Sequence, residues 1–181
     1  RDQRRRLPAP RAREGGGATV TLLLAIAATW AAELHDALGS AITARSHAEV
    51  AADLLRAVWQ RCWDADRALF EDAPGSASYS QHTNILAVLA GAVTGSHARS
   101  VMERVLADPD LVRASYYFRF YLFEALHRAG MGTTVLDQIR PWMTLLDEGF
   151  TTFPEILEPG TRSDCHAWSA SPTYELQATV A

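Results

Sequence analysis

Lysine is missing from this sequence of 181 residues, so all 17 of its cationic side chains are arginines. Acidic residues outnumber them at 21, which gives a formal net charge of -4. A nucleic-acid partner generally requires a strongly basic face, so this balance argues against one. The use of arginine alone accompanies frequent alanine, as GC-rich coding DNA would produce, and carries no functional conclusion.

Cysteine and metal-binding patterns are also scarce. The two cysteines, Cys62 and Cys165, lie far apart in the sequence and form no C-x-x-C motif, so we expect two ordinary thiols rather than a disulfide or a metal site. These two cysteines do not indicate a cellular compartment. Four histidines are scattered without an H-x-x-x-H spacing, namely His35, His47, His97 and His127. The sequence therefore predicts no metal.

The N-terminal part joins a basic segment to an apolar one. Six arginines and two prolines occur in residues 1–14, so we expect a flexible Arg-rich segment over residues 1–15. The apolar run 18–32 superficially resembles a signal peptide, but its pattern continues to a stop at Gly39, as in a packed helix. Its uncharged span is also short of the roughly 20 apolar residues that cross a membrane. We expect residues 16–181 to be one portion of a longer domain, without a membrane partner.

Apolar positions recur at helical spacing along most of the chain, with no strand-like alternation between them. Ser46 and Glu49 have the spacing of a capping box, and Ser80 is a second candidate cap. Residues 115–129 carry aromatic side chains on both sides, as expected for an inner helix that faces a second layer or a cleft. The sequence predicts an all-α fold of antiparallel helices. These helices are expected over residues 18–38, 46–63, 80–91, 96–106, 115–129, 133–148 and 167–181.

Polar chemistry is concentrated between the last two predicted helices. Glu155 follows Pro154, whose ring fixes its own backbone angle, so this carboxylate is presented from a constrained loop. His166 lies in a polar cluster that suggests a pocket, whereas Trp168 fits a core aromatic better than a ligand contact. From these residues alone, a solvated loop carboxylate is the favoured interpretation of Glu155.

Five stretches of the chain resemble the catalytic domain of bacterial α-L-rhamnosidases. They are WDADRALFEDAPG at 63–75, SQHTNILAVLAG at 80–91, YFRFYLFEAL at 117–126, GFTTFPE at 149–155 and SDCHAWSASP at 163–172. The resemblance implies a partial (α/α)6 six-hairpin barrel, of which residues 16–181 form the C-terminal portion. It also implies hydrolysis of terminal α-L-rhamnose with inversion and without a cofactor, on a rhamnose-containing carbohydrate or glycoside.

The same resemblance assigns roles to three residues. Glu155 matches the general base, His166 matches a pocket histidine, and Trp168 is placed to shape the pocket wall. Inversion also needs a carboxylic acid about 6.5 to 9.5 Å from the base, and the family's acid comes from an upstream segment that this chain lacks. The sequence departs from many family members at Phe153, which precedes Pro154 where they carry Trp.

The sequence leaves three alternatives to the rhamnosidase function. Another six-hairpin glycosidase would use the same two-carboxylate chemistry on a different sugar. A terpene cyclase or prenyltransferase would need an Asp-rich motif for a metal diphosphate, which the Asp64-Ala65-Asp66 run does not supply. A carbohydrate-binding remnant without catalysis would keep the helical scaffold but not the reaction.

Overall fold

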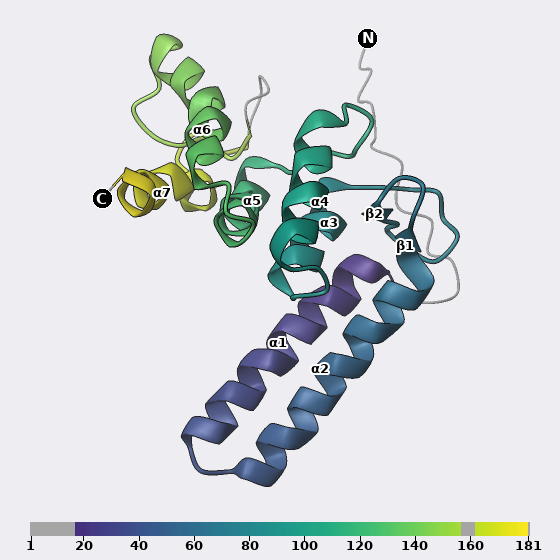
Figure 1. Cartoon of the computed structure of the whole chain (residues 1–181). Coiled ribbons are helices and arrows are strands. Elements are labelled where there is room, and N and C mark those ends of the chain that lie inside the picture. The colour runs from purple at the N-terminus through teal and green to yellow at the C-terminus, as the bar shows by residue number, and fades with distance from the viewer. Residues whose placement is uncertain (1–16, 157–161, 181) are drawn as a thin grey trace.

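The computed structural model describes residues 17–156 and 162–180, which form seven α-helices and one very short β-hairpin (Figure 1). The all-α class predicted from the sequence is confirmed. The predicted Arg-rich segment 1–15 lies outside the described residues. The helices are α1 (Ala18–Ala37), α2 (Ala41–Cys62), α3 (Gln81–Leu89), α4 (Gly95–Ala107), α5 (Tyr116–Arg128), α6 (Gly132–Asp147) and α7 (Ser171–Val180). The strands are β1 (Trp63–Asp64) and β2 (Leu69–Phe70), and a 3-10 turn, η1 (Ala167–Ser169), precedes α7.

The first six helices form three antiparallel pairs, α1 with α2, α3 with α4, and α5 with α6. Short turns join the members of each pair, and these turns contain Gly39, Gly91 and Gly130 at φ values of +75°, +78° and +67°. A residue with a Cβ is strained at such angles, so glycine ends each first helix and lets the chain reverse at once. The connections from one pair to the next are longer and lie at the other end of the helices.

The starts of α1, α3 and α5 are joined at this second end. Thr19 and Thr83 share a hydrogen bond between their hydroxyl oxygens at 2.7 Å, which ties α1 to α3. Gln81 accepts a hydrogen bond from the Ala114 N–H at 2.9 Å, which ties α3 to the segment before α5. Each of α1, α3, α5 and α7 also contacts the next in this series. They therefore form one layer, whose N-terminal ends lie together.

The core lies between this layer and helices α4 and α6. Phe70, Leu86, Met102 and Phe123 are fully buried, and they come from the β-hairpin, α3, α4 and α5. Asn84 is buried among them because its amide is fully used. It accepts from the Phe70 N–H at 2.8 Å and donates to the carbonyl oxygens of Phe70 and Ser80 at 3.1 and 3.0 Å. These bonds replace water for a polar group in the interior.

Two predicted helix starts have different outcomes. Ser80 caps α3 as predicted, because its hydroxyl accepts from the Thr83 N–H at 3.2 Å. The predicted start at Ser46 is wrong, since α2 already begins at Ala41, directly after Ser40. The reversal at Gly39 takes so few residues that the helix resumes at once, which leaves Ser46 inside α2. A capping box requires free N–H groups at a helix end, and an interior serine has none to bond.

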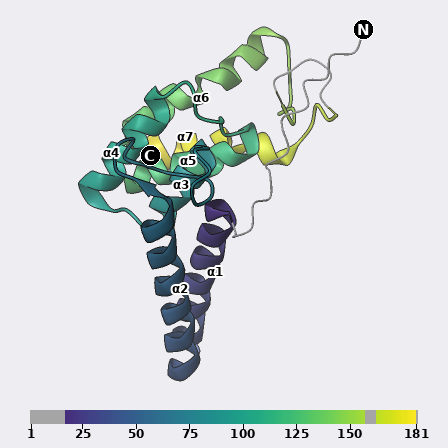
Figure 2. The same ribbon diagram turned by 90° about the vertical axis from the view of Figure 1, so that its right-hand side faces the viewer.

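Helices α1 and α2 extend away from the rest of the protein as a long pair (Figure 2). The buried face of α1 consists of Ala18, Leu22, Ala25 and Ala28, while Trp30 on its other side is 61% exposed. In length and composition alone, α1 could cross a membrane, contrary to the estimate from its uncharged span. The same criteria are met by core helices and by signal sequences, so this property does not distinguish among them.

Candidate active site

The segment between α6 and α7 is folded back on itself, and this holds Glu155 in place. Helix α6 ends at Asp147, and two residues later Gly149 turns the chain with a φ of +82°. The Glu155 N–H then donates to the Ser163 carbonyl oxygen at 2.9 Å, and the His166 N–H donates to the Phe153 carbonyl oxygen at 2.6 Å. These two bonds align residues 153–155 with residues 163–166. Glu155 and His166 are thereby brought to the same place, although eleven positions separate them in sequence.

The Glu155 carboxylate lies between a guanidinium and an imidazole. Arg162 donates to both of its oxygens, from Nη2 at 2.5 Å and from Nε at 3.1 Å. His166 Nε2 is 3.7 Å from Glu155 Oε1. The glutamate side chain is 24% exposed and that of Arg162 is 80% exposed, so the guanidinium lies on the solvent side. Sequence reasoning did not identify Arg162, because only the folded loop brings it back to Glu155.

Trp168 connects this loop to α5. Its indole stacks on the His166 imidazole with 4.9 Å between ring centroids, and it contacts the Tyr117 ring at 4.8 Å. Trp168 is 58% exposed, so the interpretation as a core aromatic is wrong. The turn η1 presents it outward, while its neighbour Ser169 is fully buried and bonds to the Pro154 carbonyl oxygen at 2.6 Å.

Ring contacts continue from Trp168 across α5 to the start of α3. Tyr117 meets Tyr121 at 6.1 Å, Tyr121 meets Phe118 at 4.9 Å, and Phe118 meets His82 at 4.4 Å between centroids. We call this series the aromatic strip, and it consists of His166, Trp168, Tyr117, Tyr121, Phe118 and His82. The strip joins η1 to the starts of α5 and α3. It explains why α5 carries aromatic residues away from its buried stripe.

Two members of the strip have perturbed acid-base properties. A hydrogen bond with Tyr117 and burial both raise the pKa of Tyr121. Burial lowers the pKa of His82, with Asp72 acting in the opposite direction. Desolvation disfavours the charged form of each group, so both side chains are neutral hydrogen-bonding groups near pH 7.

Two further polar side chains, those of Gln81 and Arg119, have structural roles. Gln81 donates to the Val105 carbonyl oxygen at 3.0 Å in addition to its bond with Ala114. Arg119 turns toward α6, where it donates to the Gln138 carbonyl oxygen at 3.0 Å and lies over Trp142. Neither side chain reaches Glu155.

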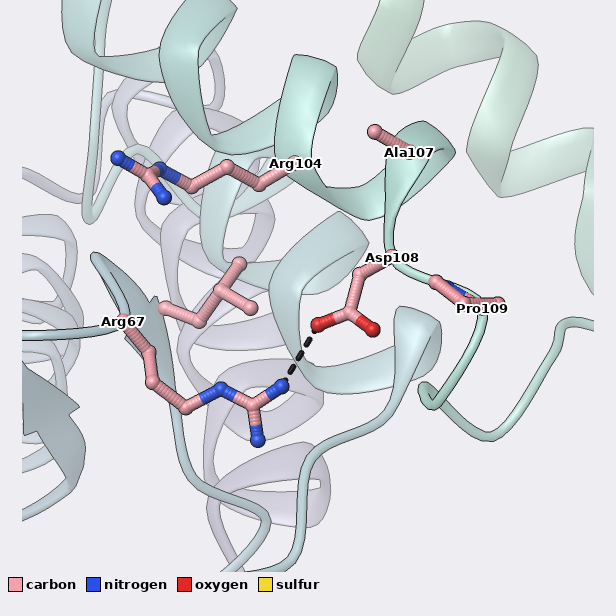
Figure 3. A pocket seen from close by; sticks show the side chains of 6 residues that line it. Arg67, Arg104, Ala107, Asp108 and Pro109 are labelled. Carbon is pink, nitrogen blue, oxygen red and sulfur yellow. Dashed lines mark hydrogen bonds and ion pairs between the residues drawn. The ribbon is translucent and has the colours of Figure 1, made fainter.

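Two of the cavities in the described residues lie away from Glu155. One, of about 400 Å³, lies beside the Arg67–Asp108 ion pair, and Figure 3 shows these side chains meeting at its edge. The other, of about 550 Å³, lies between α1, α5 and α7, and its lining includes Trp30 and Tyr121. Neither is lined by Glu155, but the second reaches the aromatic strip through Tyr121. No group of three or more metal-ligating side chains occurs within residues 17–156 and 162–180.

Comparison with known proteins gives matches among solved structures. A rhamnosidase from Klebsiella oxytoca with rhamnose bound superimposes with a TM-score of 0.82, at 24% identity, over 91% of this chain and 34% of that one. The GH78 family rhamnosidase of Bacillus sp. GL1 gives the same TM-score at 29% identity, over 95% of this chain and 20% of that one. The chain resembles a part of the GH78 rhamnosidases. This confirms the resemblance inferred from its sequence.

The chain spans about a third or less of the length of these two rhamnosidases. No protein-family model and no curated protein matches it. The similarity therefore concerns one helical portion of larger enzymes, and it supports a glycoside hydrolase relationship at that level. The roles of individual residues depend on the geometry described above.

Proposed function

We propose that residues 16–181 are the C-terminal portion of an (α/α)6 six-hairpin catalytic domain that hydrolyses terminal α-L-rhamnosides with inversion. In this proposal Glu155 is the general base, and His166 and Trp168 contact the sugar. The observation that supports it most directly is the meeting of Glu155 and His166 beside an exposed tryptophan, at the end of the layer where helix starts converge. A rhamnose-bound relative with the same fold agrees with a sugar as the ligand.

The proposed base has the properties that activation of water requires. A carboxylate offers about four lone-pair positions on two oxygens, so two bonds from Arg162 leave others for a water molecule. Water that gives its proton to Glu155 attacks the anomeric carbon as the bond to the leaving oxygen breaks. A carboxylic acid on the opposite face protonates that oxygen. We assign this acid to a segment of the longer protein outside residues 16–181.

His166 and Trp168 would hold the sugar from two directions. The imidazole can donate to or accept from a hydroxyl group, and the exposed indole face can pack against the C–H bonds of a pyranose. Because Trp168 stacks on His166, the two rings fix each other's orientation. A fixed orientation reduces the entropy lost when the substrate binds.

A second candidate, sugar binding without catalysis, is favoured by the Arg162 ion pair. A carboxylate that is held at both oxygens resembles a structural group as much as a base. The isolated chain would then bind rhamnose or its glycosides through the same side chains but would not need the upstream acid.

Substitution of Glu155 separates the two candidates. In the longer protein that contains this chain, Glu155→Gln keeps the shape of the side chain but cannot accept a proton. Turnover of an aryl α-L-rhamnoside should fall by at least about a hundredfold, as expected for loss of a general base. The matched control is Glu103→Gln on α4, where the carboxylate is exposed and far from the loop in sequence.

Each outcome decides between the candidates. Near-normal turnover by Glu155→Gln would remove Glu155 from catalysis. Absence of turnover in the unsubstituted protein, together with binding of an aryl α-L-rhamnoside in calorimetry, would favour the binding candidate. For the 181 residues alone we expect little or no turnover, and robust activity would contradict the assignment of the acid to a missing segment. The anomeric form of the first sugar released, followed by NMR, tests inversion.

A further inference from the structure

We infer that Arg162 is a positioning residue of the proposed reaction, because it holds the Glu155 carboxylate so that one oxygen, Oε2, takes the proton from water. This inference rests on the proposed function and names the atoms through which the base acts. The proton moves to Oε2 as the water oxygen bonds to the anomeric carbon. The bond to the leaving oxygen breaks in the same step, and that oxygen takes a proton from the acid.

The two carboxylate oxygens of Glu155 have different surroundings. Oε1 accepts from Arg162 Nη2 at 2.5 Å, and His166 Nε2 lies 3.7 Å from the same atom. Oε2 accepts from Arg162 Nε at 3.1 Å, which is its one bond within the described residues. Each carboxylate oxygen offers about two lone-pair positions. The less crowded oxygen, Oε2, is therefore the one with a position open to a water molecule.

The guanidinium of Arg162 fixes the carboxylate more firmly than a single hydrogen bond would. Its Nε and Nη2 atoms bond to different oxygens of Glu155, so rotation of the carboxylate breaks at least one of the two bonds. The planar guanidinium matches the planar carboxylate in this bidentate geometry. A lysine at the same position would supply the charge but would not fix the rotation.

Backbone bonds close the loop independently of the Arg162 side chain. The Glu155 N–H donates to the Ser163 carbonyl oxygen at 2.9 Å, so the residue that follows Arg162 is paired with Glu155 itself. The Thr152 hydroxyl donates to the Asp164 carbonyl oxygen and adds a second connection. Loss of the guanidinium is therefore expected to free the Glu155 side chain without opening the loop.

Removal of Arg162 has two opposing effects on the reaction, and their sizes predict which one prevails. A positive charge attracts the carboxylate and opposes transfer of a proton to it, so its loss would by itself favour the reaction. The Arg162 side chain is 80% exposed, however, so water and salt weaken this attraction. Misplacement of a catalytic group by about 1 Å can cost about a hundredfold in rate. The loss of orientation should therefore prevail, and turnover should fall.

The test measures kcat and KM for an aryl α-L-rhamnoside in the longer protein that contains this chain. Arg162→Gln should lower kcat about tenfold and leave KM within about twofold, because the orientation of the base affects the reaction step and not sugar binding. Arg162→Lys should also have a low kcat, since it keeps only the charge. The matched control is Arg140→Gln on α6, whose side chain is 79% exposed and pairs with Asp137 at 3.2 Å. This control should change neither constant.

Two further measurements separate positioning from a general effect on the fold. Guanidinium chloride added to Arg162→Ala, below the concentrations that unfold the protein, should restore part of the lost kcat, whereas equal sodium chloride should not. In a Glu155→Gln background there is no base to orient, so Arg162→Gln should lower the residual kcat by less than about twofold. Equal recovery with both salts would overturn the inference. So would a fall in the Glu155→Gln background as large as in the unsubstituted protein.

The unsubstituted protein and Glu155→Gln separate this inference from the proposed function. If the unsubstituted protein has no turnover, or if Glu155→Gln keeps normal turnover, the proposed base fails and the role of Arg162 fails with it. If Glu155→Gln loses turnover while Arg162→Gln keeps or raises kcat, only the role of Arg162 is wrong. A rise in KM for Arg162→Gln with kcat unchanged leads to the same conclusion.

Discussion

The Trp142 indole nitrogen donates a hydrogen bond to the Ser169 carbonyl oxygen at 2.7 Å in the buried interior. The Ser169 hydroxyl in turn donates to the Pro154 carbonyl oxygen at 2.6 Å. Helix α6 is thereby connected through η1 to the residue directly before Glu155. The position of the candidate base therefore depends on a tryptophan that does not contact it.

Trp142→Phe should loosen this connection while a ring still packs against Tyr116. The Ser169 carbonyl would lose its buried partner, so we expect the free energy of unfolding to fall by about 1–3 kcal/mol. Amide hydrogen exchange at residues 166–169 should become faster at the same time. Trp30→Phe, at an exposed position on α1, is the control and should change stability by less than about 0.5 kcal/mol. Unaltered exchange at η1 would show that Trp142 does not hold the loop.

Asn84→Ala should be one of the more destabilising single substitutions in this chain. It removes three buried hydrogen bonds and leaves the Phe70 N–H and carbonyl without their side-chain partner. We expect a loss of about 2–4 kcal/mol in unfolding by urea, because unpaired buried polar groups are costly. Gln60→Ala, at an exposed position on α2, should cost less than about 0.5 kcal/mol. A similar loss for both variants would contradict the role of Asn84.

Glu175→Gln should stabilise the protein increasingly as the pH rises. Glu175 on α7 is fully buried, with one oxygen 3.3 Å from His127 Nε2 and the other without a hydrogen bond in the described residues. Burial raises the pKa of Glu175, the hydrogen bond from His127 lowers it, and the net direction is upward. The folded state therefore holds this proton more tightly than the unfolded state. Its favourable contribution is complete below the ordinary glutamate pKa and is lost as the pH rises through the raised pKa.

Urea unfolding of both chains at about pH 4 and about pH 8 measures this difference, since glutamine does not titrate. The stability of Glu175→Gln relative to the unsubstituted chain should be greater at the higher pH. Repeating the comparison in a His127→Gln background removes the neighbouring imidazole. A relative stability that is constant or falls with pH in that background would contradict a raised pKa of Glu175.

The helices could be predicted from the sequence because their local signals are complete. Ser80 and Thr83 are near enough for the cap to form within α3 itself, so the predicted start was correct. Ser46 and Glu49 have an equally good local pattern, yet the tight reversal at Gly39 had already started α2. A local capping motif does not show whether the helix has already begun at an earlier residue.

The candidate site could be predicted only in part, for the same physical reason. Glu155 was singled out through its loop and the family resemblance, but its partner Arg162 depends on how that loop closes. The sequence alone does not distinguish functional from structural polar residues among Gln81, His82 and Asn84. Their difference arises from partners such as Val105 and Ala114, which lie 24 and 33 positions from Gln81.

The glycine turns lie at one end of the helices and the long connections at the other. We therefore expect the protein to tolerate inserted residues at the end with the glycine turns, but not at the end with the long connections. Helix α1 has 20 residues and is about 30 Å long at about 1.5 Å per residue. A reporter peptide inserted beside Gly39 would therefore be one helix length from the end that carries Glu155. Insertions before α3, α5 or α7 would instead alter the end that holds Glu155 and the aromatic strip, where the proposed substrate would bind.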